Sequence, residues 1–437
     1  MKRRKIKRRW QTWFGPTAEL VRHIALGLVG ICLAVIGLFM SFQSTFIDTF
    51  ATIKSLWGSF ASALSAGGDP RVVTHLTGGL LMLGGSLTAY RGLRAFFRLL
   101  GNTNGDKKST LVTSYVRRQQ LARGPKIVAL GGGTGMSTLL RGLKQYSSNI
   151  TAIVTVSDDG GSSGRLVQEL GIIPPGDMRN CLVALADAEK TMTDLFQMRF
   201  TSTMGPFSGH SLGNVLIAGL VEQAGGDFDR ALKLASEVLA IRGRVIPSTT
   251  TRVTLRALME DGTELAGETA IVDSHLRIQR IFLCPDNPVP HQAALDAIAD
   301  ADLICLGPGS VYTSVIPNLL VPGIAEACNQ SGAVKAYICN VMTQPGESDQ
   351  FTAAEHVVAI QANVPNKTFD YVLVNTGTPS QQLVQRYHAS GQELVVPDTD
   401  RLKQMGYKPV PGNLMNETDY VRHDPLRVAA RLMSLLK

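Results

Sequence analysis

Apolar residues occur in two different patterns along the chain, and the change between them falls near residue 125. Before it, two nearly continuous apolar stretches cover residues 24–42 and 72–90, each about 19 residues long. A helix needs about 20 such residues to cross the hydrocarbon layer of a membrane. We therefore predict two transmembrane helices. The alternatives are a cleaved signal peptide for the first stretch, or a pair of buried helices in a soluble domain.

After residue 125, short runs of aliphatic and β-branched residues alternate with segments of helical periodicity. Such short, continuous runs are typical of parallel strands that are buried on both faces. The alternation predicts an α/β fold with a Rossmann-like, doubly wound and mainly parallel sheet. We expect the strands at residues 126–130, 150–156, 302–306, 334–339 and 369–374.

The segment between residues 180 and 285 departs from this alternation. Its first part is largely helical, and residues 252–281 alternate like a β-hairpin with its turn at Glu260-Asp261-Gly262. We expect residues 180–285 to form an insertion lobe over the edge of the sheet. The predicted organisation is a basic segment with the two transmembrane helices (1–100), a polar linker (101–124) and a nucleotide-binding domain (125–437).

Charge is distributed unevenly along the chain. The formal net charge is +8, but residues 1–124 hold 18 Lys and Arg against 4 Asp and Glu, which leaves that part at +14 and the remainder at −6. The basic residues cluster before the first apolar stretch and after the second. Because positive residues stay on the cytoplasmic side, we predict a multi-pass cell-membrane protein whose N-terminus and large C-terminal domain are both cytoplasmic. The acidic balance of the large domain argues against nucleic acid as a partner.

The six cysteines do not form a recognisable site. None belongs to a Cys-x-x-Cys pair, and no group of cysteines and histidines has the spacing of a zinc site. Several lie inside apolar runs. We therefore expect small core residues of a reduced, cytoplasmic domain.

A glycine-rich loop, Gly131-Gly132-Gly133-Thr134-Gly135, closes the first predicted strand and opens a helix. Without side chains, its backbone N–H groups approach a phosphate closely, and the positive end of the following helix points to the same place. Thr134 and Ser137 add hydroxyl donors. The Gly-Lys-Ser/Thr ending of a P-loop is absent. We predict a phosphate cradle, with a tight turn that holds no ligand as the alternative.

Two adjacent acids, Asp158 and Asp159, follow the second predicted strand and begin the run Asp-Asp-Gly-Gly-Ser-Ser-Gly. An acid at this position commonly bonds a ribose hydroxyl in dinucleotide folds. Two adjacent carboxylates also suit Mg²⁺ near phosphates, and a solvated Asp-Gly turn is the third interpretation. Ser162 and Ser163 lie in a further anion-binding turn.

A third loop, Gly307-Pro308-Gly309-Ser310-Val311-Tyr312-Thr313, again follows a predicted strand and is rich in small and hydroxyl residues. In open α/β sheets, ligands bind outside the carboxyl ends of the strands. Because all three loops follow strands of one parallel sheet, we expect them to form one pocket.

Further candidates are polar residues in three other segments. Asp177 and Asn180 lie at a rigid turn before a helix, where Asp177 has helix capping as its alternative function. His210 and Asn214 open another helix; His210 is a candidate ligand contact or acid–base residue, and a structural capping cluster is the alternative. Arg242 is a candidate for neutralising phosphate, unless it is a solvated surface arginine.

From residue 125 to about 435, the chain resembles the gluconeogenesis-factor (YvcK-like) family of the CofD-like superfamily. The matching motifs are Gly-Gly-Gly-Thr-Gly at 131–135, Val-Ser-Asp-Asp-Gly-Gly-Ser-Ser-Gly-Arg-Leu at 156–166, Pro-Pro-Gly-Asp-Met-Arg-Asn at 174–180, Ser-Gly-His-Ser-Leu-Gly-Asn at 208–214, Gly-Pro-Gly-Ser-Val-Tyr-Thr-Ser at 307–314 and Ile-Cys-Asn-Val-Met-Thr-Gln at 338–344. The short members lack the two apolar stretches, so this chain looks like a membrane-tethered branch.

The resemblance implies a fold that binds a UDP-sugar (UDP-N-acetylglucosamine or UDP-glucose) or NAD. It also implies a regulator of cell shape and cell-wall homeostasis on gluconeogenic carbon sources. The transferase branch of the superfamily moves phospholactate onto a deazaflavin with Mg²⁺. This chain shares the first glycine loop and the Asp-Asp pair with that branch, so an Mg²⁺-dependent 2-phospho-L-lactate transferase is the alternative function. It departs from the branch after the two aspartates and after the strand at 334–339, which argues against the transferase activity.

We expect a homo-oligomer that contacts its nucleotide sugar, the membrane and regulatory proteins of the cell envelope. No catalytic residue is assigned; the candidates are Asp158, Asp159 and His210, and the two aspartates are the candidates for binding Mg²⁺. The predicted ligand-binding residues are Gly131, Gly132, Gly133, Thr134, Gly135, Ser137, Asp158, Asp159, Ser162, Ser163, Asp177, Asn180, His210, Asn214, Arg242, Gly307, Gly309, Ser310 and Thr313.

Overall fold

The structure is a computed structural model of the chain. It describes residues 43–64, 69, 72–73, 75–76, 80, 83–84, 87 and 111–437, apart from 188, 202–204, 206, 365, 418 and 419. Two compact units are found, residues 1–120 and 121–437. The first predicted transmembrane helix (24–42), and all but a few positions of the second (72–90), lie outside the described residues.

Two helices are described before the large unit begins. Helix α3 (Gln43–Leu64) exposes large apolar side chains, including Phe50 and Leu56. Helix α5 (Leu111–Ala122) occupies the second half of the predicted linker, so that part of the linker is helical. Among the described residues, no single helix is long and apolar enough to cross a membrane. One bent pair, Val311–Leu320 with Ile324–Gln330, passes by length and composition alone.

The large unit is built on a seven-stranded sheet in which every neighbouring pair is parallel. This confirms the predicted Rossmann-like α/β fold. In spatial order the strands are β10 (Lys408–Gly412), β9 (Tyr371–Asn375), β8 (Val334–Ile338), β7 (Leu303–Leu306), β1 (Ile127–Gly131), β2 (Ile150–Val154) and β3 (Arg244–Pro247).

The five central strands lie where the apolar runs predicted them, but β3 and β10 were not predicted. Both are edge strands, and both contain proline: Pro247 in β3, Pro409 and Pro411 in β10. A proline has no N–H to donate, so sheets place it mainly on edge strands. These prolines also interrupt the apolar pattern by which the central strands are recognised, so the pattern did not reveal β3 and β10.

Alternate residues of the central strands enter two separate cores, as the two-residue period of a strand requires. The side chains of Val128 and Leu130 belong to the core on one face, and those of Ile127 and Ala129 belong to the core on the other.

The helices of the large unit are α6 (Gly133–Leu143), α7 (Gly161–Leu170), α8 (Gly176–Leu185), α9 (Glu189–Gln197), α10 (Leu212–Gln223), α11 (Phe228–Leu239), α12 (Glu268–Asp273), α13 (Gln292–Ala299), η2 (Val311–Val315), α14 (Ile316–Leu320), α15 (Ile324–Gln330), α16 (Ala353–Asn363), α17 (Gln381–Ala389), α18 (Thr399–Gln404) and α19 (Pro425–Ser434). Helices α13, α14, α15, α16 and α18 contribute to the core of Val128 and Leu130, and α6, α8, α10, α11 and α19 contribute to the core of Ile127 and Ala129.

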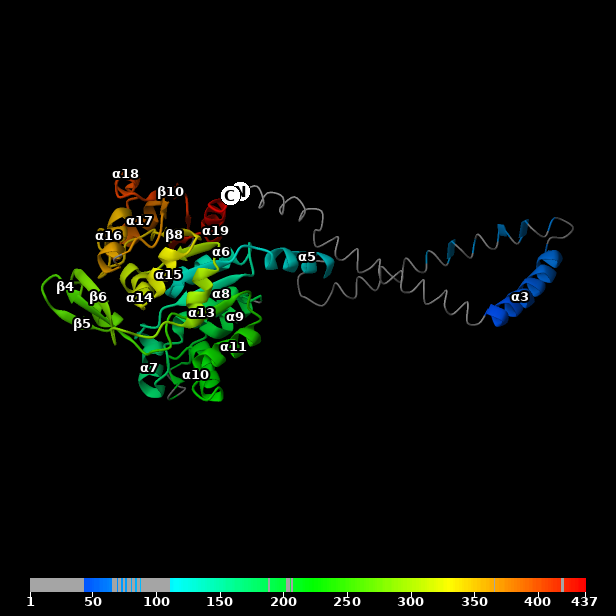
Figure 1. The fold of residues 1–437 in the computed structure, drawn as a ribbon, viewed down its shortest axis with the longest axis horizontal. Helices are drawn as coiled ribbons and strands as arrows, with labels where there is room; N and C mark the ends of the chain where they lie inside the picture. Colours follow the sequence, from blue (N-terminus) through cyan, green and yellow to red (C-terminus); the bar gives the residue numbers. More distant parts are fainter. Residues whose placement is uncertain are drawn as a thin grey trace. The chain divides into compact units, whose positions relative to one another are not determined.

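The segment 180–285, expected as one insertion lobe, is divided between the two layers. Its helices pack on the main sheet, and it supplies the edge strand β3. The predicted hairpin is present as β4 (Thr254–Met259) and β5 (Glu264–Ala266), with β6 (Ile278–Cys284) as a third antiparallel strand. In Figure 1 this small sheet lies at the side of the large unit, near α14 and α16.

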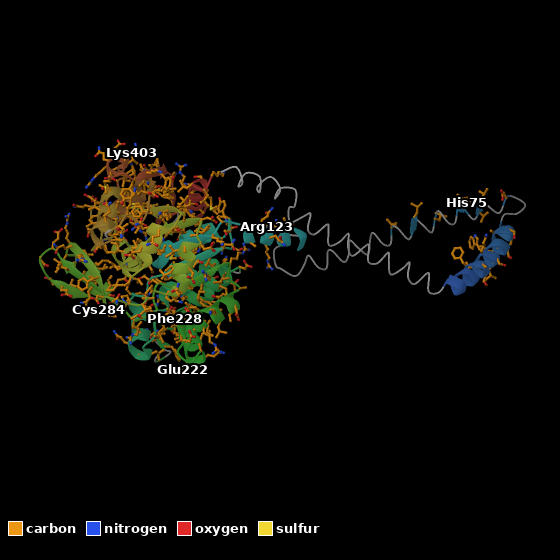
Figure 2. All side chains as sticks on the ribbon, in the orientation of Figure 1. His75, Arg123, Glu222, Phe228, Cys284 and Lys403 are labelled. Atoms are coloured by element: carbon orange, nitrogen blue, oxygen red, sulfur yellow. The ribbon has the colours of Figure 1, made fainter. Side chains whose placement is uncertain are left out.

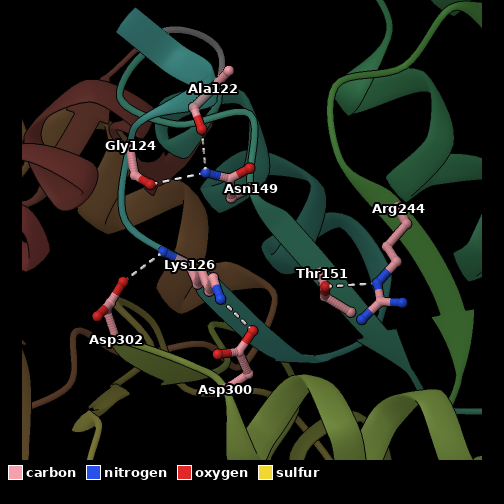
Figure 3. Close-up of polar contacts among 8 residues, drawn as sticks. All are labelled: Ala122, Gly124, Lys126, Asn149, Thr151, Arg244, Asp300 and Asp302. Atoms are coloured by element: carbon pink, nitrogen blue, oxygen red, sulfur yellow. Dashed lines mark hydrogen bonds and ion pairs between the residues drawn. The ribbon is translucent and has the colours of Figure 1, made fainter.

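Polar contacts close the amino edge of the main sheet (Figure 3). The backbone N–H of Lys126 donates to Asp302, and its ammonium pairs with Asp300. Asn149 donates to two carbonyl oxygens of the chain that enters β1, and Arg244 donates to Thr151 across β2 and β3. These groups satisfy one another, so the open polar groups must be sought at the carboxyl edge.

The cysteines follow the prediction with one exception. All five in the part of the chain that the structure describes are free thiols, and Cys181, Cys305, Cys328 and Cys339 are buried. Cys284, at the end of β6, is exposed (Figure 2). The apolar run of β6 alternates in burial, which puts its last residue on the outer side.

Gly142 fixes how closely α6 approaches α19. A side-chain carbon at this position would overlap the carbonyl oxygen of Pro425. We predict that Gly142→Ala lowers the free energy of unfolding by about 1–3 kcal/mol through overpacking, although alanine favours helices. Gly219→Ala in α10 is the control, since nothing lies within 4 Å of the added carbon; it should gain about 0.5–1 kcal/mol. Urea denaturation measures both, and equal gains would contradict the packing argument.

Candidate functional site

The first and third predicted loops meet at the carboxyl edge of β1 and β7. A side-chain carbon on Gly135 would lie 2.5 Å from the carbonyl oxygen of Pro308, so the two backbones touch only because residue 135 is a glycine. Asn318 of α14 donates to the carbonyl oxygen of Gly131 over 3.1 Å. The two loops therefore form one rim at the point where the strand order reverses.

Three helices beside the glycine loop begin without a side-chain cap, as do η2 after β7 and α17 after β9. The N-cap residues of α6, α7 and α8 are Gly132, Gly160 and Pro175, and none of them accepts a backbone hydrogen bond through its side chain. By contrast, α10, α11, α13, α16 and α19 each begin with a side-chain cap. Uncapped first turns present backbone N–H groups and the positive end of the helix dipole, although in α6 the N–H of Gly133 already donates to Asp177. The edge is therefore suited to an anion.

A cavity of about 250 Å³ opens beside the glycine loops. Burial lowers the pKa of His423 to about 4, so at neutral pH Arg422 is the one charged side chain in the lining. The lining residues are Thr134, Gly135, Thr138, Pro308, Gly309, Asn340, Val341, Met342, Thr343, Gln344, Tyr387, Gln392, Val421, Arg422 and His423.

The outer wall of the cavity comes from the C-terminal part of the chain. Arg422 belongs to β12 (Val421–His423), which pairs with β11 (Met415–Glu417). Its guanidinium lies 5.0 Å from the centre of the Tyr420 ring, and that of Arg386 lies 5.3 Å from the same ring. The Tyr387 hydroxyl accepts from the backbone N–H of Val421 over 2.9 Å. These contacts hold the wall against α17.

Four carboxyl groups gather on the other side of the glycine loop. Asp158 is the common neighbour whose charge acts on Asp177 and Glu268. Burial is the first cause in each case: it raises the pKa of Asp177 to about 6, that of Glu268 to about 9 and that of Glu347 to about 7. Repulsion between neighbouring carboxylates adds to the shifts of Asp177 and Glu268. At neutral pH this group therefore holds protons and donates as well as accepts hydrogen bonds.

The hydroxyls of the third loop face these acids. The side chain of Thr313 forms hydrogen bonds with both Glu268 and Glu347, and the side chain of Ser310 forms one with Glu347. One oxygen of Glu347 has no partner although the residue is only 7 % exposed. The hydroxyls of Ser310 and Thr313 are therefore engaged by carboxyl groups, and ligand binding by these two residues stays a prediction.

The two adjacent aspartates have different surroundings. Asp158 Oδ1 accepts from the backbone N–H of Gly160 over 2.9 Å. Asp159 accepts from both the N–H and the hydroxyl of Thr269, at 3.0 and 2.8 Å, which ties it to α12. Within the described part of the chain, no three side chains of His, Cys, Asp or Glu are placed to hold a metal ion. Mg²⁺ is commonly held by one or two carboxylates together with phosphate oxygens and water, so the Mg²⁺ site at the aspartate pair stays a prediction.

Ser162, His210 and Asn214 form a buried polar network behind α7. Ser162 Oγ lies 3.0 Å from His210 Nδ1 and accepts from Asn214 Nδ2 over 3.0 Å. Arg179 joins the network by donating to Asn214 Oδ1 and Ser211 Oγ. Burial, and next the charge of Arg165, lower the pKa of His210, so the neutral ring is favoured.

The remaining predicted residues divide between the edge and other places. Asn180 accepts from Arg179 at the start of α8, and Ser163 lies against Gly176 there. Ser137 donates to the carbonyl oxygen of Thr134 inside α6, so its hydroxyl is engaged. Arg242 precedes β3, at the amino edge, and pairs with Asp187 over 2.5 Å. The structure therefore does not bring Arg242 to the other candidates.

Sequence reasoning missed five residues of this edge: Arg179, Glu268, Asn340, Glu347 and Arg422. A signal existed for Asn340, because it follows the strand β8 as the other loops follow theirs, and its Oδ1 accepts from the Gly309 N–H. Glu347 lies farther along the same loop after β8, whereas Glu268 and Arg422 come from segments without a motif. Only the packing of the small sheet and of the C-terminal strands brings them to the edge.

Comparisons with known proteins agree on the family of the large unit. A family model described as 2-phospho-L-lactate transferase CofD matches residues 127–415. A crystal structure from Bacillus halodurans, described as a member of the UPF0052 family, superimposes with a TM-score of 0.68 at 46% identity, covering 71% of this chain and 99% of that one.

Two sequence relatives differ in how much of the chain they match. The gluconeogenesis factor of Bacillus subtilis is 47% identical over 314 residues, which are 72% of this chain and 98% of that protein. The putative gluconeogenesis factor of a Nostoc species is 43% identical over 429 residues, 97% of this chain and 92% of that protein. The N-terminal region is therefore shared with the longer relative.

Proposed function

Because the chain belongs to the gluconeogenesis-factor family of CofD-like proteins, we propose that it is a membrane-anchored regulator that binds a UDP-sugar. The ligand is UDP-N-acetylglucosamine or UDP-glucose, and NAD is the other candidate. Through this ligand the protein adjusts cell shape and cell-wall homeostasis when cells grow on gluconeogenic carbon. Its relatives carry the name gluconeogenesis factor, which supports the link to carbon metabolism.

The observation that carries the proposal is the set of three uncapped helix starts beside the two glycine loops. Backbone N–H groups and helix dipoles bind phosphate oxygens without a lysine. The adjoining cavity holds one cationic side chain, Arg422, and several amides and hydroxyls. This combination supports a ligand with a diphosphate and an uncharged polar end.

The two sides of the glycine loop suit the two ends of a nucleotide sugar. The cavity beside Pro308 and Arg422 would take the nucleoside, while the diphosphate follows the loop. The sugar would then face Asp158, Asp177 and Glu268, whose oxygens accept hydrogen bonds from hydroxyl groups. A carboxyl group that keeps its proton also donates to a sugar oxygen.

A regulatory function is favoured over catalysis by the burial of the only nucleophile–base pair found among the described candidate residues. The sequence alone showed no such pair, whereas the structure joins Ser162 to His210. Both residues are nearly inaccessible, with 6 % and 3 % of their surface exposed. Asn214 donates to Ser162 and accepts from Arg179, which ties α7, α8 and α10 together, so the pair supports the architecture of the edge.

A second candidate function is that of a transferase of phospholactate-type groups, which the matching family model favours. In that case a nucleotide-activated phospholactate donor would be turned over, and Asp158→Asn would abolish the turnover. Binding without turnover would favour the regulator.

We also propose that the protein is anchored in the membrane and that it self-associates. The two apolar stretches with basic flanks support an anchor of two spans, and the match of the Nostoc relative over nearly the whole chain shows that this region is not peculiar to one protein.

We predict that the full chain stays in the membrane fraction after an alkaline carbonate wash, whereas residues 111–437 are released. Release of the full chain would refute the anchor.

Calorimetry on residues 111–437 tests ligand binding. The Bacillus relatives correspond to this part alone, and one of them forms a crystal structure by itself, so the fragment should fold. We expect saturable binding of UDP-N-acetylglucosamine or UDP-glucose, and weaker or no binding of UTP, which places a third phosphate near the acids. If neither UDP-sugar nor NAD binds at millimolar concentration, the proposed function is wrong.

Arg422 gives a residue-level test. We predict that Arg422→Ala weakens UDP-sugar binding about 10- to 100-fold, because it removes the charged donor of the cavity. Arg386→Ala is the matched control: it removes a guanidinium that also packs on Tyr420 but does not line the cavity. Equal losses in the two variants would indicate that the arginines act only by holding the wall in place.

A further inference from the structure

The carboxyl group of Asp177 lies in the first turn of α6. A side-chain carbon on Gly132 would be 2.5 Å from Asp177 Oδ2 and 2.8 Å from Thr155 Cγ2. The backbone N–H of Gly133 is a hydrogen-bond donor to Asp177. Asp177 therefore reaches across from α8 and accepts a hydrogen bond at the place where a phosphate would accept it. It does not cap its own helix, which was the alternative function considered for it.

A phosphate bound at this loop meets that carboxyl group. If Asp177 stayed ionised, two anions would lie against each other with little water between them. Paired carboxyls relieve such repulsion by sharing a proton. The same arrangement is open to a carboxyl and a phosphate, because a protonated carboxyl is a donor and a diphosphate oxygen is an acceptor.

The surroundings of Asp177 already favour its protonated form. Burial, and next the charge of Asp158, raise its pKa to about 6, while the Gly133 N–H and Arg179 act in the opposite direction. Glu268 of α12 and the thiol of Cys181 are coupled to the same carboxyl. Asp177 nevertheless remains partly exposed, so a ligand can reach it.

We propose that Asp177 is a proton-carrying ligand contact: its carboxyl group takes up a proton from solution when the ligand binds, and donates it in a hydrogen bond to an oxygen of the diphosphate. This inference rests on the proposed function, because it places a diphosphate at the glycine loop. It extends that function by making affinity for the ligand depend on pH. The diphosphate of a UDP-sugar has no proton to exchange near neutral pH, so the uptake belongs to the protein.

The sign of the dependence follows from the ionisation of the free protein. Above about pH 6 free Asp177 is mostly ionised, and each binding event must then recruit a proton. Affinity should fall by up to about tenfold for each pH unit above 6. Below that pH the carboxyl is already protonated, and the dependence should disappear.

The experiment is a calorimetric titration of the full chain with UDP-N-acetylglucosamine and UDP-glucose between pH 5.5 and 8.5. At each pH, two buffers with different ionisation enthalpies give the number of protons taken up. For the wild type we expect uptake approaching one proton near pH 7.5. Asp177→Asn should abolish the uptake, flatten the pH dependence and bind more tightly than the wild type at pH 8. Asp187→Asn, which removes a carboxylate at the amino edge, should behave like the wild type.

The outcomes separate the two proposals. Binding without proton uptake by the wild type, or uptake that persists in Asp177→Asn, overturns this inference and leaves the proposed function intact. Absence of binding at every pH in both proteins refutes the proposed function itself. Should Asp177→Asn fail to fold, Asp177→Ser takes its place: uptake that persists in that variant belongs to another carboxyl, such as Glu347 with its raised pKa, and overturns the inference.

Discussion

Backbone N–H groups at the carboxyl edge of a parallel sheet must find acceptors, and this requirement organises the site. Parallel strands all end at one edge, and the helices that follow them begin there. Within the described part of the chain, α10, α11, α13, α16 and α19 each begin with a side-chain cap from their own sequence. The starts of α6, α7 and α8 instead rely on neighbouring segments or on a ligand. The difference follows from glycine or proline at the three N-cap positions.

The glycines that leave these helices uncapped also let the loops approach one another. Gly135 allows the backbone of Pro308 to touch α6, and Gly132 leaves room for the carboxyl of Asp177. A side chain at either position would push apart two segments that lie far apart in sequence. The glycines of these loops therefore have two functions. They leave backbone N–H groups without a side-chain cap, and they allow the close contact that joins separate loops into one rim.

The sequence was sufficient for the central part of the fold and for the loops, but not for what surrounds them. Five strands were recognised because both of their faces are buried, whereas the proline-containing edges β3 and β10 were missed. Arg242 was predicted to contact the ligand because β3 was not recognised. A residue that directly precedes β3 lies at the amino edge of the sheet, away from the glycine loops. Glu268 and Arg422 reach the site from distant segments without a motif, and their positions depend on tertiary packing alone, whereas Glu347 lies in the loop after β8.

The charges around the rim limit the class of ligand more than the rim itself does. Helix starts and Arg422 supply positive potential over a short distance, enough for a diphosphate. Immediately beyond the loop lie Asp158, Asp177, Glu268 and Glu347; burial raises the pKa of the last three, and repulsion between carboxylates adds to the shifts of Asp177 and Glu268. A third phosphate would meet these groups, whereas the hydroxyls of a sugar would form hydrogen bonds with them. Under the proposed function, a loop that would accept many nucleotides in isolation would therefore favour, in this setting, one whose diphosphate ends in a neutral polyhydroxyl group.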